Sequence, residues 1–326
     1  MTTLYHFQMV GLFEAKAPII HTEETIGNVA RIKRIKVLDA GKPVLVPALS
    51  GNGFRGQLRD LIGDHFTEMV REDDNLVTMS RLMYGVIFSG GVLREKYKKL
   101  GTHMESLMQA VPLLRVMGSA FGNRMMPSKI SVSHLVPLAQ ETGSYLADTL
   151  AELPESGHAL VEHLAEYRAN LPAVEELTFE EGPLTRKKDE ENPVLTRNVE
   201  LSGEAVEQQQ MIYHVECITG GTMMLQRVGS KFPLSEVELG CLLDGLCAFA
   251  RAPFVGGRGA AGYGRVEFAY RLTLTPLASD GEEQELWLDA ATLVGDLPEP
   301  LKGMLASYRE DAANRAQEIR TALGLV

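Results

Sequence analysis

Residues 256–268 read GGRGAAGYGRVEF, in which Gly257, Gly259 and Gly262 form the pattern G-x-G-x-x-G. In a dinucleotide-binding fold this pattern follows a strand and opens a helix, whose N-terminus faces the pyrophosphate. Here the order is reversed, because a helical apolar pattern precedes the glycines and a strand pattern follows them at 265–277. The glycines therefore favour a tight helix-to-strand connection over a nicotinamide site, and we expect no cofactor.

The same loop has a second interpretation, in which its main chain lies against the phosphates of a nucleic acid. Glycine leaves backbone N–H groups uncovered, and two cations, Arg258 and Arg265, lie beside them. On the loop alone, the purely structural connection and the phosphate contact both stay open.

Residues 50–60, SGNGFRGQLRD, offer the same chemistry at the start of a helix. Apolar residues recur at helical spacing from Phe54 onward, and Ser50 or Asn52 is placed to cap the helix. A different face carries two cations one turn apart, Arg55 and Arg59. A helix N-terminus bordered by glycines and arginine can bind an anion, although an ordinary capped helix explains the same residues. Two such bends in one chain favour a shared polyanion site.

The order of the remaining patterns indicates an α+β fold. Residues 4–15 read as a first strand, and two strand–helix–strand units lie before and after an acidic helical insertion at 142–181. Residues 182–210 are polar and turn-rich, as in a long protruding loop or hairpin. We expect a mostly antiparallel sheet with helices on one face, and a final helix at about 300–325.

Composition limits the class of protein. The chain has 326 residues, three cysteines without a C-x-x-C pair, and a net charge of −11. We expect neither a signal peptide, a membrane span nor a disulfide framework, and we expect a cytoplasmic protein. The negative charge argues against nucleic-acid binding, but it is uneven. RIKRIK at 31–36 can be a solvated strand edge or a wall of a basic groove, and Arg124 and Lys129 have the same ambiguity.

Motifs for catalysis are missing from the sequence. It contains no H-E-x-x-H, no G-x-S-x-G and no G-x-x-x-x-G-K-[ST]. His21 lies near the end of a predicted strand and could assist RNA cleavage, although a lone histidine is more often structural. We therefore expect neither a metal site nor catalytic residues.

The order of several segments resembles a known family. These are APIIHT, VPALSGNGFRGQLRD, VMGSAFGNRMMPSKISVSHLVPL, LTRKK, QQQMIYHVECITGGT and FVGGRGAAGYGRVEF. Together they resemble the RAMP superfamily of CRISPR-associated proteins, over residues 4 to 275. Within it they are most similar to the backbone (Cas-seven-like) subunit of class 1 effector complexes, in its type IV form.

The resemblance implies a modified ferredoxin-like or RRM-like palm with an antiparallel sheet, a helical insertion and a protruding thumb hairpin. It divides the chain into palm (1–141), insertion (142–181), thumb (182–211), palm (212–275) and an acidic C-terminal segment with a helix (276–326). The implied partners are guide (CRISPR) RNA, copies of the chain in a helical filament, other effector subunits, a helicase, and target DNA or RNA through the guide. Binding would be independent of sequence and made mainly to phosphate and sugar, while base pairing reads the target.

The residues expected to contact RNA come from the two bends, the basic segments and the thumb. They are Arg31, Lys33, Arg34, Ser50, Asn52, Arg55, Arg59, Arg124, Lys129, Arg186, Lys187, Arg197, Gln210, Met211, Gly257, Arg258, Gly259 and Arg265.

An alternative function comes from the same resemblance. Type III relatives cleave target RNA with an aspartate in the loop after the first strand. The matching residues 21–40 contain Glu23, Glu24 and Asp39, and none of them aligns with that aspartate. Asp39 is already explained by a DAGK turn. We therefore expect an RNA-binding scaffold and no metal-dependent nuclease.

Overall fold

The centre of the fold is strand β1 (Leu4–Ala15), which pairs antiparallel with a neighbour on each side. The computed structural model describes residues 3–72, 77–93, 103–122, 124–185, 212–278 and 281–325. In the main sheet the strand order is β10-β13-β1-β15-β16, while β9 pairs with β13 and β14 with β1. The bounds of these strands are β9 Ile130–Val132, β10 Val136–Pro137, β13 Met223–Ser230, β14 Leu234–Ser235, β15 Val266–Pro276 and β16 Gln284–Asp289.

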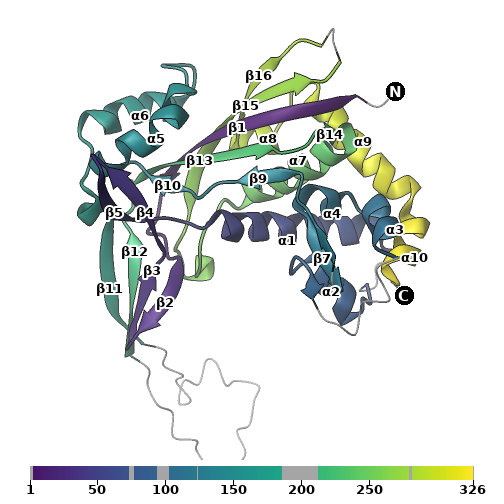
Figure 1. Ribbon diagram of the computed structural model, residues 1–326, viewed down its shortest axis with the longest axis horizontal. Helices are drawn as coiled ribbons and strands as arrows, with labels where there is room; N and C mark the ends of the chain where they lie inside the picture. Colours follow the sequence, from purple (N-terminus) through teal and green to yellow (C-terminus); the bar gives the residue numbers. More distant parts are fainter. Residues whose placement is uncertain are drawn as a thin grey trace, which may run out of the picture.

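The connections of the main sheet confirm the predicted ferredoxin-like α+β fold. The chain runs from β1 through α1 (Gly51–Val70) to β9 and β10, then from β13 through α7 (Glu236–Arg251) to β15. The two crossover helices lie on the same face of the sheet (Figure 1). Within the residues that the structure describes, every strand pair of this sheet is antiparallel, as the alternating sequence patterns predict.

Aromatic side chains fill the space between the sheet and these helices. Phe13 from β1 stacks on Phe268 from β15 and meets Phe54 from α1 edge to face. Each such pair adds about 1 kcal/mol beyond the burial of its area. Gly11 is needed beside them, because a Cβ there would lie 2.5 Å from the ring of Tyr270.

The opposite face of the sheet is covered by the insertion. Helices α5 (Gly143–Ala151) and α6 (Ala159–Ala169) pack their apolar residues on Val10, Leu12 and Leu225. Helices therefore cover both faces, and the prediction of helices on one face was wrong. The physical reason is that the insertion, although acidic overall, has its own apolar stripe (Leu146, Leu160, Val161 and Leu164).

A second sheet, here called the arm sheet, extends from one end of the main sheet (Figure 1). Its strand order is β11-β12-β3-β2, in which β11 and β12 are antiparallel neighbours joined by residues 186–211. The bounds are β2 Thr22–Ile26, β3 Val29–Ile32, β11 Thr178–Thr185 and β12 Ile212–Ile218. Short helices η2 (Gln140–Thr142) and η3 (Val174–Leu177) flank the insertion, and the hairpin of β4 (Arg34–Asp39) and β5 (Lys42–Pro47) follows β3.

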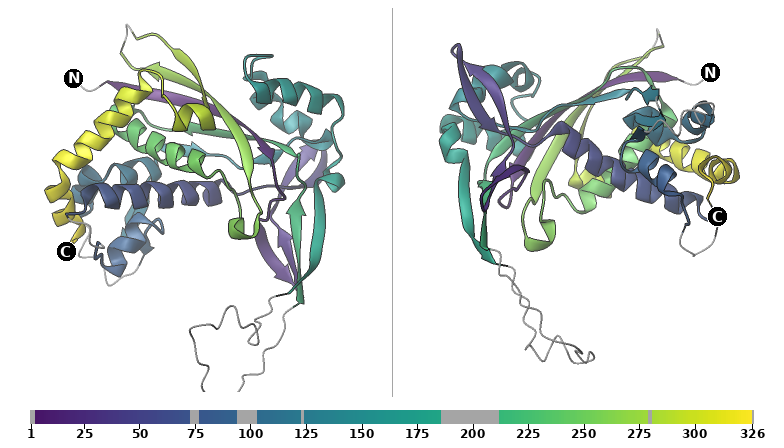
Figure 2. Two further views of the ribbon diagram at one scale, coloured as in Figure 1. Left: turned by 180° about the vertical axis from the view of Figure 1, so that it is seen from behind. Right: turned by 60° about the horizontal axis from the view of Figure 1, so that its bottom comes forward.

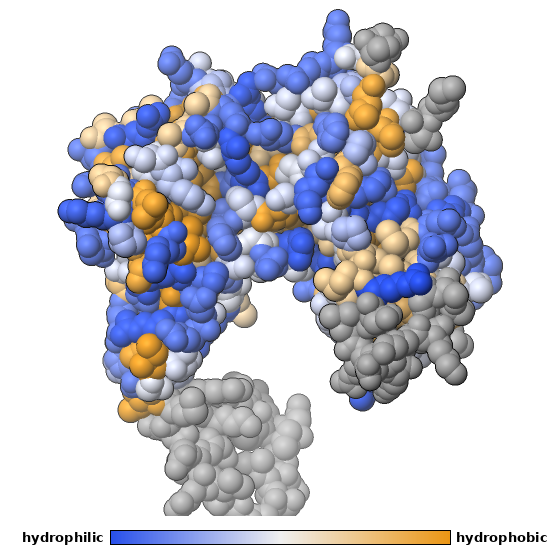
Figure 3. All heavy atoms as spheres, in the orientation of Figure 1, coloured by the Kyte–Doolittle hydropathy of each residue, from blue (hydrophilic) through white to orange (hydrophobic). Residues whose placement is uncertain are grey.

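A small lobe lies at the other end of α1 and consists of short elements. These are α2 Arg81–Ile87, β6 Val92–Leu93, α3 His103–Ala110, α4 Pro112–Met117, β7 Ser119–Gly122 and β8 Arg124–Met126. Figure 3 shows the surface hollowed between the arm sheet and this lobe, and α1 runs from one to the other. In the described part of the chain, no helix is long and apolar enough to cross a membrane.

The C-terminal residues complete the core. Strand β16 extends the main sheet, and α8 (Ala290–Val294), α9 (Leu301–Asn314) and α10 (Ala316–Leu323) follow it (Figure 2). The expected final helix is thus two helices that meet at Arg315. Helix α9 crosses α7 so closely that a Cβ on Gly240 would lie 2.1 Å from the carbonyl oxygen of Met304.

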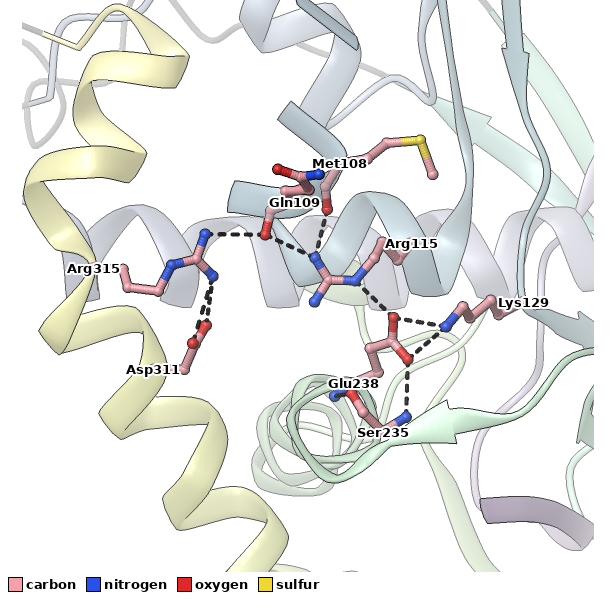
Figure 4. Close-up of polar contacts among 8 residues, drawn as sticks. All are labelled: Met108, Gln109, Arg115, Lys129, Ser235, Glu238, Asp311 and Arg315. Carbon is pink, nitrogen blue, oxygen red and sulfur yellow. Dashed lines mark hydrogen bonds and ion pairs between the residues drawn. The ribbon is translucent and has the colours of Figure 1, made fainter. Parts of the chain in front are cut away.

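A buried carboxylate fixes the first turn of α7 (Figure 4). Glu238 accepts hydrogen bonds from Lys129 Nζ at 2.7 Å, Arg115 Nε at 2.7 Å and the N–H of Ser235 at 2.9 Å. Burial alone would raise the pKa of Glu238, but these three donors outweigh it and the net pKa is lowered. The carboxylate therefore holds α4, the strand-connecting residue Lys129 and α7 together.

We predict that Glu238→Gln lowers the free energy of unfolding by about 3 kcal/mol at neutral pH, because two cations lose their buried partner. Since the folded-state pKa of Glu238 is depressed, its contribution is present above the unfolded pKa of about 4.3 and is lost as the pH falls further. Urea unfolding should therefore show that the difference in the free energy of unfolding between wild type and variant becomes smaller as the pH falls below about 4.3. Glu236→Gln, in the same turn, is the control and should change little.

Candidate nucleic-acid interface

The two glycine-bordered bends both contribute residues to the lining of one pocket of about 480 Å³. The first bend contributes the start of α1, and the second contributes the residues after α7. Gln57 of α1 links them by donating from Nε2 to the carbonyl oxygen of Phe254 at 2.6 Å. The pocket is lined by His21, Leu49, Ser50, Asn52, Gly53, Phe54, Gly56, Gln57, Asp60, Leu135, Val255 and Gly256.

Two histidines cap α1. The N–H of Ser50 donates to Nε2 of His21 at 3.0 Å, and the N–H of Gly51 donates to Nδ1 of His134 at 3.1 Å. Ser50 is the N-cap residue, as predicted, but its side chain makes no capping bond. Burial lowers the pKa of His21, with a further contribution from Lys33, which favours the neutral ring that an acceptor requires.

The first bend is therefore only partly free for an anion. The amides of Ser50 and Gly51 already donate hydrogen bonds to the two imidazole rings. Those of Asn52 and Gly53 have no acceptor among the described residues, and both residues are exposed at the pocket. Sequence patterns gave no signal for this arrangement, because His21 and His134 are far apart in the chain.

In the second bend, two of the glycines serve the packing of the chain. A Cβ on Gly256 would lie 2.2 Å from the carbonyl oxygen of Ile20, and one on Gly264 would lie 2.1 Å from that of Val255. Both have positive φ, +76° and +81°. The N–H of Gly257 donates to Ile20 at 2.8 Å, so this predicted phosphate donor is already occupied.

The remaining part of the loop is open. Gly259 begins the short helix η4 (Gly259–Ala261), and all three of its residues are exposed. A Cβ on Gly262 would meet nothing within 4 Å. The amides of Arg258 and Gly259 donate to no acceptor in the described ranges, so this stretch of main chain is accessible to a ligand.

Three of the predicted arginines lie in or next to the two bends. None of the three has an ion-pair partner in the part of the chain that the structure describes. Arg55 is half-buried on α1, while Arg258 and Arg265 are exposed. Arg258 instead contacts Tyr213 of β12: its guanidinium carbon lies 4.6 Å from the ring centroid, and Nη1 donates to the hydroxyl oxygen at 2.9 Å.

The basic segment at 31–36 is mostly paired with carboxylates of its own chain. Arg34 forms a two-pronged ion pair with the buried Glu216, which joins β4 to β12. Lys33 pairs with Glu23, and Arg31 lies 3.7 Å from Glu180. Arg34 therefore has a structural role in joining these strands, and the RNA contact at this residue stays a prediction.

Three other predicted contacts lie away from the pocket. Arg59 is 4% exposed and donates to the carbonyl oxygens of Met117 and Gly118, and burial lowers its pKa to about 10. It therefore ties α1 to the small lobe and is not accessible to RNA. Lys129 is held by Glu238 at the first turn of α7, about 20 Å of helix from the second bend. Arg124 is exposed on β8 of the small lobe.

The predicted thumb contacts Arg186, Lys187, Arg197, Gln210 and Met211 lie outside the described residues. Tyr213, which flanks the second bend, was missed by the sequence analysis, although it lies on the same strand face as the buried Val215 and Cys217.

The carboxylates considered for catalysis lie on two different elements. Glu23 and Glu24 are exposed on β2, and Asp39 lies at the tip of the β4–β5 hairpin. Among the described residues, no group of three His, Cys, Asp or Glu side chains is placed to hold a metal ion.

Comparison with known proteins gives matches among solved structures. No family model matches the sequence, and no curated protein matches it. The chain is similar to a chain of a solved structure described as "Type IV-B CRISPR Complex". The two share 20% identity with a TM-score of 0.46, and the match covers 84% of this chain and 92% of that chain.

We predict opposite effects for two glycines of α1. Gly51→Ala should destabilise the protein by about 2 kcal/mol, because the new Cβ would lie 2.4 Å from the carbonyl oxygen of Val132. Gly56→Ala should stabilise it by about 1 kcal/mol, since nothing lies within 4 Å and alanine favours a helix. Thermal and urea unfolding measure both, and equal effects would contradict the tight approach at Gly51.

Proposed function

We propose that the protein is an RNA-binding backbone subunit of a class 1, type IV-like CRISPR effector complex. In this role copies of the chain polymerise along a guide RNA and present it for pairing with target DNA or RNA. The observation that supports the proposal best is the meeting of two glycine-bordered bends at one pocket, with unpaired arginines beside them. Phosphate contacts of this kind position a strand without reading its sequence.

The surroundings of the bends support this path for the RNA. In an ordinary RRM the open face of the sheet stacks bases. Here that face is covered by α5 and α6. At the end of α5, Glu152 forms an ion pair with Arg227, and its carbonyl oxygen accepts a hydrogen bond from Arg271. The surface is hollowed between the arm sheet and the small lobe (Figure 3). We therefore propose that the RNA binds at α1 and the second bend instead of on the sheet.

The distribution of charge also fits a local binding surface on an acidic protein. The net charge is −11, and much of the basic segment at 31–36 is neutralised within the chain. Arg55, Arg258 and Arg265 therefore supply positive charge where the main chain is bare. We assign the RNA surface to these arginines with Asn52 and Gly259, together with the thumb residues at 186–211.

The proposed division of the chain follows from the same role. Palm (1–141 and 212–275), insertion (142–181), thumb (182–211) and C-terminal segment (276–326) would form one filament subunit in the cytoplasm. Its proposed partners are guide RNA, copies of itself, other effector subunits and a helicase. The protein itself would act as a scaffold and not as an enzyme.

We predict that Arg55→Gln with Arg265→Gln weakens binding of single-stranded RNA about equally for every sequence. Each lost phosphate contact should reduce the slope of log affinity against log salt by about 1. Arg168→Gln, an exposed arginine of α6 on the far face of the sheet, is the matched control. Fluorescence anisotropy over a series of salt concentrations measures the slopes, and an unchanged slope in the double variant would refute the assignment.

A separate experiment tests the scaffold role. The assembled complex is incubated with guide-complementary RNA and Mg²⁺, and the products are separated by size. We expect intact RNA. Regularly spaced fragments that disappear with Asp39→Ala would instead establish the alternative, a metal-dependent nuclease.

A further inference from the structure

The contact between Arg258 and Tyr213 has the form of a stacking surface for a planar ligand. The guanidinium lies over the tyrosine ring, 4.6 Å from its centroid, and the hydrogen bond to the hydroxyl oxygen fixes its orientation. Tyr213 is half-buried in the arm sheet, whereas Arg258 is exposed. One side of the guanidinium is thus supported by the ring, and the exposed side chain remains accessible to a second planar group.

No carboxylate neutralises this guanidinium at ion-pair distance within the described residues. Glu181, on the neighbouring strand β11, is engaged with Tyr263 and with the thiol of Cys217. Burial and the hydrogen bond with Glu181 raise the pKa of Tyr263 to about 12, so this phenol stays a donor to the carboxylate. Arg258 therefore keeps its charge available for an anionic ligand.

The loop around Arg258 leaves room for such a ligand. Its neighbours are Gly257 and Gly259, and a Cβ on Gly259 would make only ordinary contact with Phe254 at 3.6 Å. Arg258 itself has a left-handed conformation, φ +62°, which glycine adopts at lower cost. Arg265, seven residues further along the chain, is also exposed.

We propose that Arg258 and Tyr213 form a stacking site for an unpaired nucleobase of the bound RNA strand. This inference rests on the proposed function and adds a base contact to the phosphate contacts. Bases in single strands stack on arginine planes and on aromatic rings, at about 1–3 kcal/mol per base, which corresponds to about 5- to 150-fold in affinity. Stacking tolerates every base, so the contact suits a strand whose sequence varies.

The test compares Arg258→Lys with wild type on two single-stranded probes. One is an RNA of about 12 nucleotides with 2-aminopurine in place of adenine, and the other is an abasic strand of equal length. Lysine keeps the charge and loses the plane. We expect about tenfold weaker binding of the base-bearing RNA, unchanged binding of the abasic strand, and loss of the 2-aminopurine quenching. Tyr213→Leu should behave like Arg258→Lys, while Tyr213→Phe keeps the ring and should retain most of the quenching.

The outcomes separate the two proposals. Equal weakening of both probes by Arg258→Lys, or no weakening of either, would refute the stacking site while leaving RNA binding intact. Failure of the wild-type protein to bind either probe would refute the proposed function itself. Competition with adenosine monophosphate distinguishes the source of the base: we expect the strand to stay bound, and displacement would mean that the site takes free nucleotides. Unfolding curves for each variant confirm that the fold is unchanged.

Discussion

The arrangement of the whole interface depends on a short run of hydrogen bonds made by residues 16–21 as they leave β1. Ile19 exchanges hydrogen bonds with Ile218 of the arm sheet, and Ile20 accepts from the amide of Gly257. The next residue, His21, accepts from the first amide at the start of α1. One extended segment therefore holds the arm sheet, the second bend and α1 at fixed positions. Because the carbonyl group of Ile20 lies this close to the second bend, position 256 demands glycine, where a Cβ would lie 2.2 Å from that oxygen.

This constraint explains why glycines of one motif have different roles. Gly256 and Gly264 allow close approach within the protein, and Gly257 donates an internal hydrogen bond. Gly259 lies in an exposed turn with only ordinary contact to Phe254, and Gly262 faces open space. A pattern of letters cannot separate these roles, since glycine has no side chain that would show which surface it faces.

The arginines also fall into two groups, those bound within the protein and those free to bind a ligand. A guanidinium binds a buried carboxylate, as at Arg34, or buried carbonyl oxygens, as at Arg59, whenever the fold brings them within reach. Only those without such partners keep their charge for a ligand.

The fold was more predictable from the sequence than the site. The period of apolar residues identifies β1, α1, α7 and β15, because these elements bury one regular face against a common core. Strands β11 and β16 were missed, since both belong to sequences that are acidic overall and have weak alternation. The covering of the second sheet face was missed for a similar reason: the apolar stripe of the insertion is diluted by glutamates. The caps from His21 and His134 were beyond prediction, because they depend on residues brought together only by the completed sheet.

The covered sheet also shows why the fold alone does not locate the ligand. A ferredoxin-like palm has one natural binding surface, the sheet face without helices, and in this chain the insertion occupies it. The proposed RNA path therefore uses the segments that the fold adds at the edge: the start of α1, the second bend and the arm sheet. Such a surface consists mainly of main-chain amides, arginines and one tyrosine, with few side chains that could tell one base from another. That chemistry suits a subunit that holds any guide and leaves the reading of sequence to base pairing.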